Sequence, residues 1–244
     1  MKQKNILCIH QGYELYGSDK TFIQSIQSIK EKFPTSNITI KIPKEGPLSQ
    51  ELSKINVSIQ YGEFYVLRKS QIKRDAVFLP IILIKNVLKS IKEINSHDVT
   101  YINSIVVIDY IIGSIFSKNK SIVHVHEIPT GITAKIFSAI LRASKSKILF
   151  NSNSTKSSFS GLRGDVIYNG SPHPQELTAK PVDKINFLMI GRFNSWKGQD
   201  FFAETIAMMP KDALKNIAIK IVGGVFEDQI FFKERVEKII AENN

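Results

Sequence analysis

Short apolar runs alternate along this chain with longer segments whose apolar residues recur every three or four positions. Short runs favour buried strands, and the spaced pattern favours helices. Their alternation predicts a doubly wound, mostly parallel α/β sheet. We expect strands over residues 5–10, 38–42, 57–60, 99–103, 122–126, 148–150, 166–168, 185–190 and 217–222. We expect helices over residues 18–33, 48–55, 72–94 with a break near Pro80, 105–116, 199–209 and 230–240.

A proline-rich segment divides this pattern. Residues 171–184 contain Pro172, Pro174 and Pro181 and lack apolar periodicity, which is typical of a linker. We therefore expect a first Rossmann-like domain over residues 1–170 and a second over residues 185–244. The second shows two strand–helix units, whereas a doubly wound domain usually has about four to six strands. We expect this domain to be partial.

Composition indicates a globular cytoplasmic protein. Hydrophobic residues make up 43% and charged residues 23% of the 244 residues, as in soluble domains. The single cysteine, Cys8, excludes an internal disulfide and fits a reducing compartment. Residues 1–5 at the start of the chain are mostly polar, and we see no apolar core of a signal peptide there. The most apolar stretch, residues 77–88, is interrupted by Pro80 and Lys85 and is too short to span a bilayer.

The net charge of +11 is placed unevenly along the chain. Residues 183–244 are balanced, so the first 182 residues carry the whole excess. Two basic segments, residues 68–92 and 134–164, fit an anionic lipid surface, a nucleic acid or simple solubility. Phe137, Phe150 and Phe159 lie at core-like positions, so the aromatic residues that a nucleic-acid surface needs are missing there. We expect no nucleic-acid partner.

The stretch from Ile190 to Gly198 joins an apolar run that reads as a buried strand to a helical pattern. A loop at the carboxyl end of a strand is where open α/β sheets bind ligands. Arg192 and Lys197 can face one anion there, and glycines at 191 and 198 let the backbone approach it. The stretch therefore reads as a diphosphate site or, alternatively, as a corner with two solvated cations.

Polar residues also end several strands of the first domain. His124 and His126 share a face of their strand, but no third ligand at suitable spacing follows, so we expect no metal. Asn103-Ser104 ends the preceding strand. Gly17-Ser18 opens a helix that Ser18 can cap, which is a weak anion-site pattern. Asn169-Gly170 is a turn signal.

These segments together resemble retaining GT-B glycosyltransferases of family four. The strand followed by Gly191-Arg192-Phe193, with Lys197-Gly198 after it, is similar to that family's donor-binding segment. His124-Val125-His126-Glu127, Gly17-Ser18-Asp19, Val166-Ile167-Tyr168-Asn169-Gly170 and Gly223-Gly224 resemble further family segments. The resemblance covers essentially the whole chain, but the family's later two-glutamate segment is absent.

The resemblance implies transfer of a sugar from a nucleotide-diphosphate sugar, with retention and without a metal or other cofactor. It implies catalytic roles for His126, Arg192 and Lys197, and donor binding by Gly17, Ser18, Arg192, Lys197 and Gly223. Cleft candidates are Asn103, Ser104, Glu127 and Asn169. Implied partners are a UDP- or GDP-sugar, a lipid-linked or polysaccharide acceptor and, with the basic first domain, the inner face of the cell membrane. The alternative is a non-catalytic, membrane-docking or acceptor-binding half that needs a partner chain.

Overall fold

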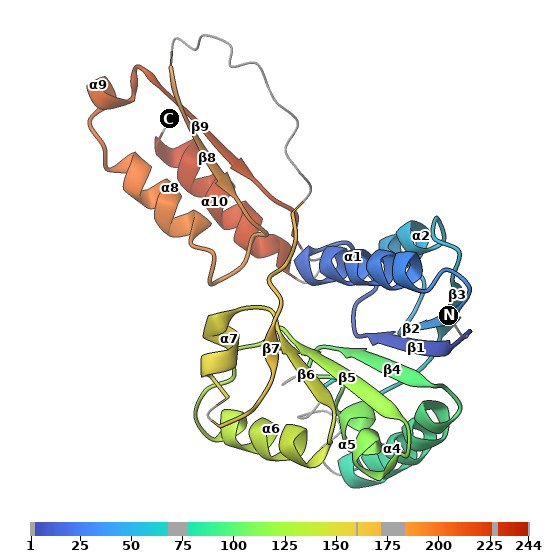
Figure 1. The fold of residues 1–244 in the computed structure, drawn as a ribbon. Helices are drawn as coiled ribbons and strands as arrows, with labels where there is room; N and C mark the ends of the chain where they lie inside the picture. Colours follow the sequence, from blue (N-terminus) through green and yellow to red (C-terminus); the bar gives the residue numbers. More distant parts are fainter. Residues whose placement is uncertain (1–2, 68–77, 160, 172–183, 226–228, 244) are drawn as a thin grey trace. The chain divides into compact units, whose positions relative to one another are not determined.

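The computed structural model describes residues 3–67, 78–159, 161–171, 184–225 and 229–243. The chain divides into two compact units, Met1–Pro172 and His173–Asn244 (Figure 1). The expected linker lies almost wholly outside the described residues, as do Arg68, Lys69, Lys73 and Arg74 of the first basic segment. Residues 72–77, where we expected the start of a helix, lie outside them too.

The first unit is built on a seven-stranded parallel sheet with the order β3-β2-β1-β4-β5-β6-β7. Its strands are β1 (Asn5–His10), β2 (Asn37–Ile42), β3 (Ser58–Tyr61), β4 (Val99–Asn103), β5 (Lys120–Val125), β6 (Lys147–Phe150) and β7 (Asp165–Val166). Every pairing is parallel. The strand order reverses direction beside β1, which is the topological switch point where such sheets bind ligands.

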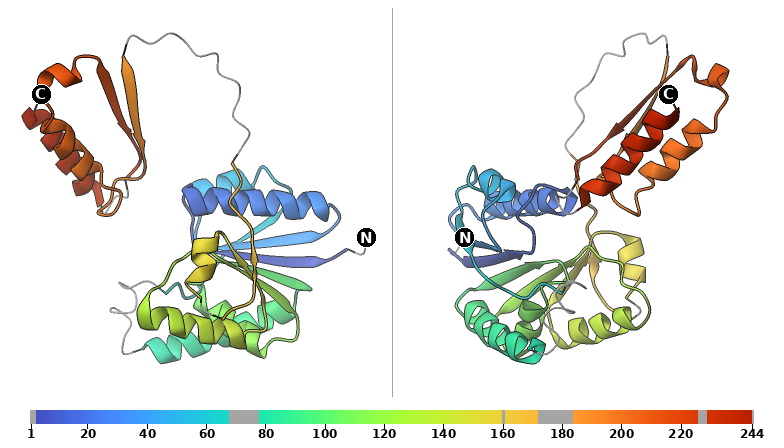
Figure 2. Two further views of the ribbon diagram at one scale, coloured as in Figure 1. Left: turned by 60° about the vertical axis from the view of Figure 1, so that its left-hand side comes forward. Right: turned by 180° about the vertical axis from the view of Figure 1, so that it is seen from behind.

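Helices cover both faces of this sheet (Figures 1 and 2). On one face α1 (Gly17–Lys32) and α2 (Pro47–Leu52) pack against Ile6, Cys8 and Tyr101. On the other, α4 (Leu79–Asn95), α5 (Ile108–Phe116) and α6 (Gly131–Ala143) cover Leu7, Ile9 and their neighbours. A short helix, α7 (Asn153–Ser157), begins at Ser152, whose side chain accepts the Thr155 N–H. Two separate apolar cores result, one on each side of the sheet.

Two helix starts differ from the sequence expectation. Helix α1 begins at Gly17 and its N-cap is Tyr16, so the expectation that Ser18 caps it is wrong. The Asp19 carboxylate accepts the Tyr16 N–H at 2.8 Å and thereby fixes the earlier start. Helix α5 begins at Ile108, three residues later than expected, because Val107 pairs with Val66 in an isolated bridge and the Val106 carbonyl accepts the Leu67 N–H at 2.8 Å.

The second unit pairs β8 (Ile185–Ile190) with β9 (Ile217–Val222) in parallel. Helices α8 (Gln199–Ala207) and α10 (Ile230–Asn243) pack together, and α9 (Lys211–Leu214) precedes β9. The expectation that the strand over 185–190 is buried is wrong, since Ile190 is 73% and Ile185 63% exposed. The core of Phe193, Ala203 and Val236 takes in Ile221 of β9 but no described residue of β8. With β9 as its one partner among the described strands, β8 is an edge.

Candidate functional sites in the two units

The parallel register of the first unit places three polar residues in a row across its sheet. His10 of β1 is paired with Asn103 of β4, and Asn103 is paired with His124 of β5. Paired residues of parallel strands point to the same face, which here is the face that α1 covers. His10 and Asn103 are fully buried and His124 is 4% exposed. The carboxyl edge of the sheet therefore carries a compact polar cluster.

A continuous hydrogen-bonded chain runs through this cluster, from Asp19 to His126. We call it the strand-end network. The Asn103 amide nitrogen lies 2.7 Å from His10 Nδ1, and Asp19 Oδ1 lies 2.6 Å from His10 Nε2. If the Asn103 amide donates, His10 accepts at Nδ1 and its Nε2–H donates a hydrogen bond to the Asp19 carboxylate. The Asn103 oxygen then accepts from His126 Nε2 at 2.9 Å. This assignment leaves the His126 Nδ1 lone pair as a hydrogen-bond acceptor.

Burial keeps His124, in β5, and His126, just after β5, in the neutral form. Desolvation lowers the pKa of His124 to about 4. It lowers the pKa of His126 to about 3, with smaller effects from His124 and His10. The two rings lie 4.2 Å apart between centroids, so they share one face as expected from the sequence. Tyr101 supports them, since its hydroxyl lies 2.7 Å from His124 Nδ1.

Ser104 and Glu127 form a support beside this network. The Ser104 hydroxyl donates to Glu127 Oε1, and Glu127 Oε2 accepts the N–H groups of Ile105 at 3.2 Å and His126 at 3.1 Å. Ser104 has a positive φ of 92°, which is strained for a residue with a side chain. The Glu127 carboxylate thus holds both the turn after β4 and the backbone of His126.

The other candidates of the first unit lie at the start of α1, directly before Asp19 of this network, and in the segment after β7. Gly17 and Ser18 form the first turn of α1, where helix N–H groups have no intrahelical acceptor. A Cβ at Gly17 would meet nothing within 4 Å. Asn169 is exposed in the segment after β7, and its neighbour Gly170 lies near Gln24 of α1. Asn103, Ser104, His126 and Glu127 are therefore brought together, and Asn169 is not.

The loop that carries Arg192 and Lys197 in the second unit is held by two buried amides. Gln199 Nε2 donates to the carbonyls of Gly191 at 2.9 Å and Arg192 at 3.0 Å. Asn194 Oδ1 accepts the N–H groups of Trp196 at 3.2 Å and Lys197 at 3.0 Å. Gly198 then starts α8 with a φ of 75°. The loop has a defined backbone although Lys197 itself is exposed.

The loop after β9 packs directly against this first loop. Gly191 donates to the Val222 carbonyl and Phe193 to the Gly224 carbonyl, both at 2.9 Å. A Cβ on Gly223 would lie 1.9 Å from the Gly191 carbonyl oxygen, so only glycine permits this approach. Gly223 therefore has a packing reason that the sequence pattern alone did not supply. We call the pair formed by residues 191–198 and 223–224 the loop pair.

Four residues of these two sites went unnoticed in the sequence: His10, Tyr101, Asn194 and Gln199. His10 was visible as a polar residue at the end of an apolar strand. It would have been found by comparing it with Asn103 and His124, since each follows an apolar run. Asn194 and Gln199 carried no comparable signal, because loop polar residues are common. Among the described residues, no three His, Cys, Asp or Glu side chains are grouped to hold a metal ion.

Comparison with known proteins adds information on the fold. No family model and no curated protein matches the sequence. HepE of Anabaena, solved with UDP and glucose, is similar with a TM-score of 0.72 at 15% identity, over 98% of this chain and 66% of its own. A glycosyltransferase of Rickettsia africae gives 0.70 at 18% identity, over 99% and 66%. The fold is of the GT-B type.

The same comparisons limit what the fold says. At these identities the likeness establishes architecture alone. A protein of Listeria monocytogenes, named as a candidate UDP-N-acetylglucosamine 2-epimerase, is also similar, with a TM-score of 0.60 at 8% identity over 98% of this chain and 66% of its own. This chain spans about two thirds of the length of these structures.

Proposed function

We propose that this chain is part of a retaining family-four glycosyltransferase that transfers a sugar from a UDP- or GDP-sugar to an acceptor. The observation that carries the proposal is the loop pair of the second unit, where a backbone fixed by Gln199 and Asn194 presents Arg192 and Lys197. Two similar GT-B structures of Anabaena HepE contain UDP or UDP-glucose, which supports a nucleotide-sugar ligand.

The chemistry assigns roles to the residues of each unit. Departure of a nucleoside diphosphate develops negative charge, and cations placed in advance stabilise that charge in the transition state. Arg192 and Lys197 would supply these cations without a metal, and Gly223 would let the second loop close on the first. Gly17 and Ser18 would offer helix N–H groups to an anion. Neutral His126 would accept a hydrogen bond from a sugar or acceptor hydroxyl, in an orientation that Asn103 and Glu127 hold.

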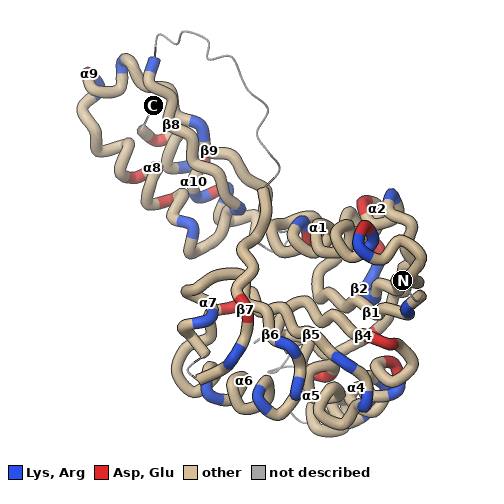
Figure 3. Tube along the Cα trace, viewed as in Figure 1, with Lys and Arg blue, Asp and Glu red and all other residues tan. Residues whose placement is uncertain are grey.

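The acceptor belongs to the same proposal. We propose a lipid-linked or polysaccharide precursor of a surface glycan, met at the inner face of the cell membrane. The support is electrostatic: the first 182 residues carry the whole net charge of +11, and basic residues lie on α4 and α6 and in the segments that follow α5 and α6 (Figure 3). Basic residues near an anionic membrane surface each add about 1 kcal/mol of binding energy.

A second candidate function rests on the exposed strand β8. Its apolar residues Ile185, Leu188 and Ile190 are 58–73% exposed. An edge strand with such side chains is a template for pairing with another chain. In this version the protein is a non-catalytic half that docks to a membrane or an acceptor, and a partner chain completes the donor site.

Titration with UDP separates the two candidates. Trp196 is the sole tryptophan of the sequence, lies inside the loop pair and is 68% exposed, so its fluorescence reports on this site. We expect saturable binding of UDP, followed by fluorescence and by calorimetry. Lys197→Gln should weaken it about 10- to 100-fold, the effect of one charge-assisted contact. Lys211→Gln is the matched control, an exposed lysine outside the loop pair. Absence of binding of UDP, and of GDP titrated in the same way, by both methods would overturn the catalytic proposal and favour the non-catalytic half.

A further inference from the structure

Helix α4 of the first unit exposes a row of apolar side chains to solvent, which we call the crest. Ile81 is 67%, Ile84 61% and Leu88 63% exposed, and Phe116 at the end of α5 is 66% exposed. The spacing of the three α4 residues, at i, i+3 and i+7, places them along one line of the helix. Soluble proteins rarely leave large apolar side chains exposed in a contiguous row without a binding role.

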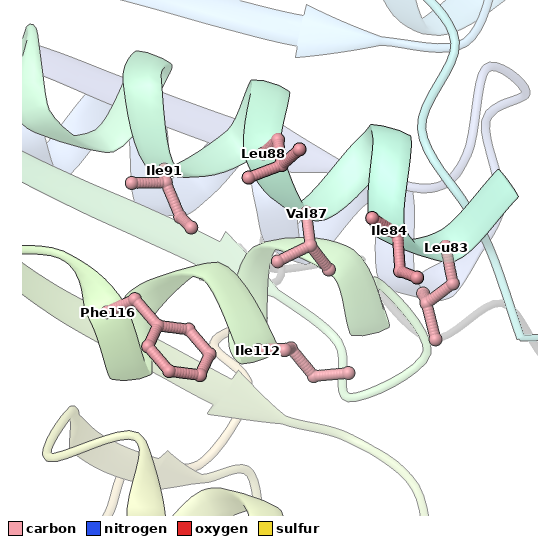
Figure 4. Close-up of a pocket in the computed structure, with 7 residues that line it drawn as sticks. All are labelled: Leu83, Ile84, Val87, Leu88, Ile91, Ile112 and Phe116. Carbon is pink, nitrogen blue, oxygen red and sulfur yellow. The ribbon is translucent and has the colours of Figure 1, made fainter. Parts of the chain in front are cut away.

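The crest continues into a groove between α4 and α5. All seven residues that line this groove are apolar, and its volume is about 470 Å³. Figure 4 shows them converging from the two helices: Leu83, Ile84, Val87, Leu88 and Ile91 from α4, and Ile112 and Phe116 from α5. We call the crest and the groove together the α4–α5 surface.

Three exposed lysines lie along the other side of the crest. Lys85, Lys89 and Lys92 each follow an apolar position of α4 by one residue, which turns them about 100° around the helix. The acidic residues nearby face elsewhere. Glu93 bonds the Lys41 ammonium at 2.7 Å, and Asp109 is buried and accepts the Tyr65 N–H. The α4–α5 surface is thus apolar with a positive border that no described carboxylate neutralises.

We propose that this surface docks onto an anionic lipid bilayer, with α4 lying in the plane of the interface. The inference rests on the part of the proposed function that brings the protein to a membrane, and it names the surface that does so. An amphipathic helix with an apolar crest and bordering lysines matches such a site, since lysine stems extend along apolar surface while their ammonium groups reach lipid phosphates. No helix among the described residues is long and apolar enough to cross a bilayer.

Charge argues for lipid rather than a second copy of the chain. In a two-fold dimer the same patch meets itself. Lys85, Lys89 and Lys92 would then border the lysines of the other copy without a described carboxylate to pair them. Like charges brought together across an interface are unfavourable, whereas anionic headgroups neutralise them.

The test is flotation of the full chain with vesicles of phosphatidylcholine alone or mixed with phosphatidylglycerol. We expect the wild type to bind the anionic vesicles at least about tenfold more strongly, with the preference lost at high salt. Ile84→Gln with Leu88→Gln should reduce binding to the anionic vesicles about tenfold or more. Lys85→Gln, Lys89→Gln and Lys92→Gln together should abolish the preference for anionic lipid. All five side chains are exposed, so these variants should fold as the wild type does.

Matched control variants remove side chains of the same two kinds, aliphatic and basic, from other parts of the chain. Ile185→Gln with Leu188→Gln removes two exposed aliphatic side chains from β8, and Lys30→Gln, Lys32→Gln and Lys54→Gln remove three positive charges from α1 and the turn after α2. If either control weakens vesicle binding as much as its counterpart, the α4–α5 surface is not the docking site.

Two further outcomes would overturn the inference. One is wild-type protein that binds neither vesicle. The other is a wild-type dimer that Ile84→Gln with Leu88→Gln converts to a monomer, since a second copy would then cover the surface. UDP binding followed at Trp196 is independent of these results, so loss of vesicle binding with UDP binding retained refutes only the docking surface.

Discussion

The strand-end network of the first unit and the loop pair of the second reach order by different means. In the network, side chains hold one another: Asp19, His10, Asn103 and His126 form one hydrogen-bonded chain whose inner members are buried. In the loop pair, two amide side chains hold the backbone and Gly223 lets two loops touch, while Lys197 stays exposed. The first site fixes the orientation of the neutral His126 ring, and the second fixes the backbone that carries Arg192 and Lys197.

This difference suggests that the first site contributes more to stability and the second more to ligand binding. In a buried hydrogen-bonded network each member left unpaired keeps its desolvation cost, so the loss of one member lowers the stability of the fold. A loop in which Lys197 is exposed costs little to keep folded and is suited to binding an anion. Damage to the first site should therefore appear as unfolding, and damage to the second as weaker ligand binding. The chain allows both to be followed at once, since all seven tyrosines precede residue 172 and the one tryptophan follows it.

The largest effect should come from Asn103→Ala. The change removes the amide that pairs with His10 Nδ1, His126 Nε2 and the Tyr101 hydroxyl. Each buried group left unpaired costs about 1–3 kcal/mol, so we expect a loss of about 3–5 kcal/mol. Urea unfolding followed by tyrosine near-ultraviolet circular dichroism measures it.

Asn37→Ala is the control for this change. Asn37 also bonds across strands, to Gln3 and Asn5, but its bonds are exposed. Its loss should change stability by no more than about 0.5 kcal/mol. Equal effects of the two substitutions would mean that the network at the strand ends is not a coupled unit.

The sequence predicted the strands well because parallel strands buried on both faces read as apolar runs. All nine expected strands are present, with ends that differ by up to two residues. The expected strand 185–190 shows the limit of this reasoning. It has the apolar composition of a buried strand, yet it is exposed, because composition does not report how many neighbours a strand has.

The sites were predictable only in part. Arg192, Lys197 and Gly223 were named from a motif, and the structure adds the reason why Gly223 is glycine. The contact between His10 and Asn103 could not be predicted because it joins residues 93 positions apart. Such a contact follows from strand order and register, which a single sequence does not reveal. Whether any of these residues binds substrate stays a prediction.

The next largest effect after that of Asn103→Ala should come from Gly223→Ala in the loop pair. A Cβ there would lie 1.9 Å from the Gly191 carbonyl oxygen, so the Gly191–Arg192 backbone must move. Misplacement of a binding group by about 1 Å can cost about 100-fold, and we expect a loss of that size in UDP affinity at Trp196. The tyrosine signal of the first unit should not change.

Gly17→Ala is the counterpart in the first unit. Nothing lies within 4 Å of a Cβ at Gly17, and its φ is not positive. The helix N–H groups stay in place, so stability should change by about 0.5 kcal/mol or less. A large loss of stability in Gly17→Ala, or unchanged UDP affinity in Gly223→Ala, would contradict the contrast between the two glycines.

The smallest effect is a dependence of the first unit's stability on pH. The folded state lowers the pKa of His124 to about 4 and of His126 to about 3, from 6.5. Between these values and 6.5 the unfolded chain binds more protons, so stability is full above about pH 6.5 and falls as the pH drops. Asp109 acts in the opposite direction, because burial raises its pKa to about 6 and the folded state then takes up the proton. We expect a net loss of about 2 kcal/mol from pH 7 to pH 5.

Two variants separate these opposing groups. His126→Gln can still donate to Asn103 but does not titrate, so the loss between about pH 7 and pH 5 should shrink. Asp109→Asn removes the opposing proton uptake, so the loss should grow. Opposite signs in the two variants, read from the tyrosine signal, are required if the buried histidines set the acid limit of the first unit. A loss that neither variant alters would assign the acid sensitivity to groups outside the strand-end network, and the network would then act on orientation alone.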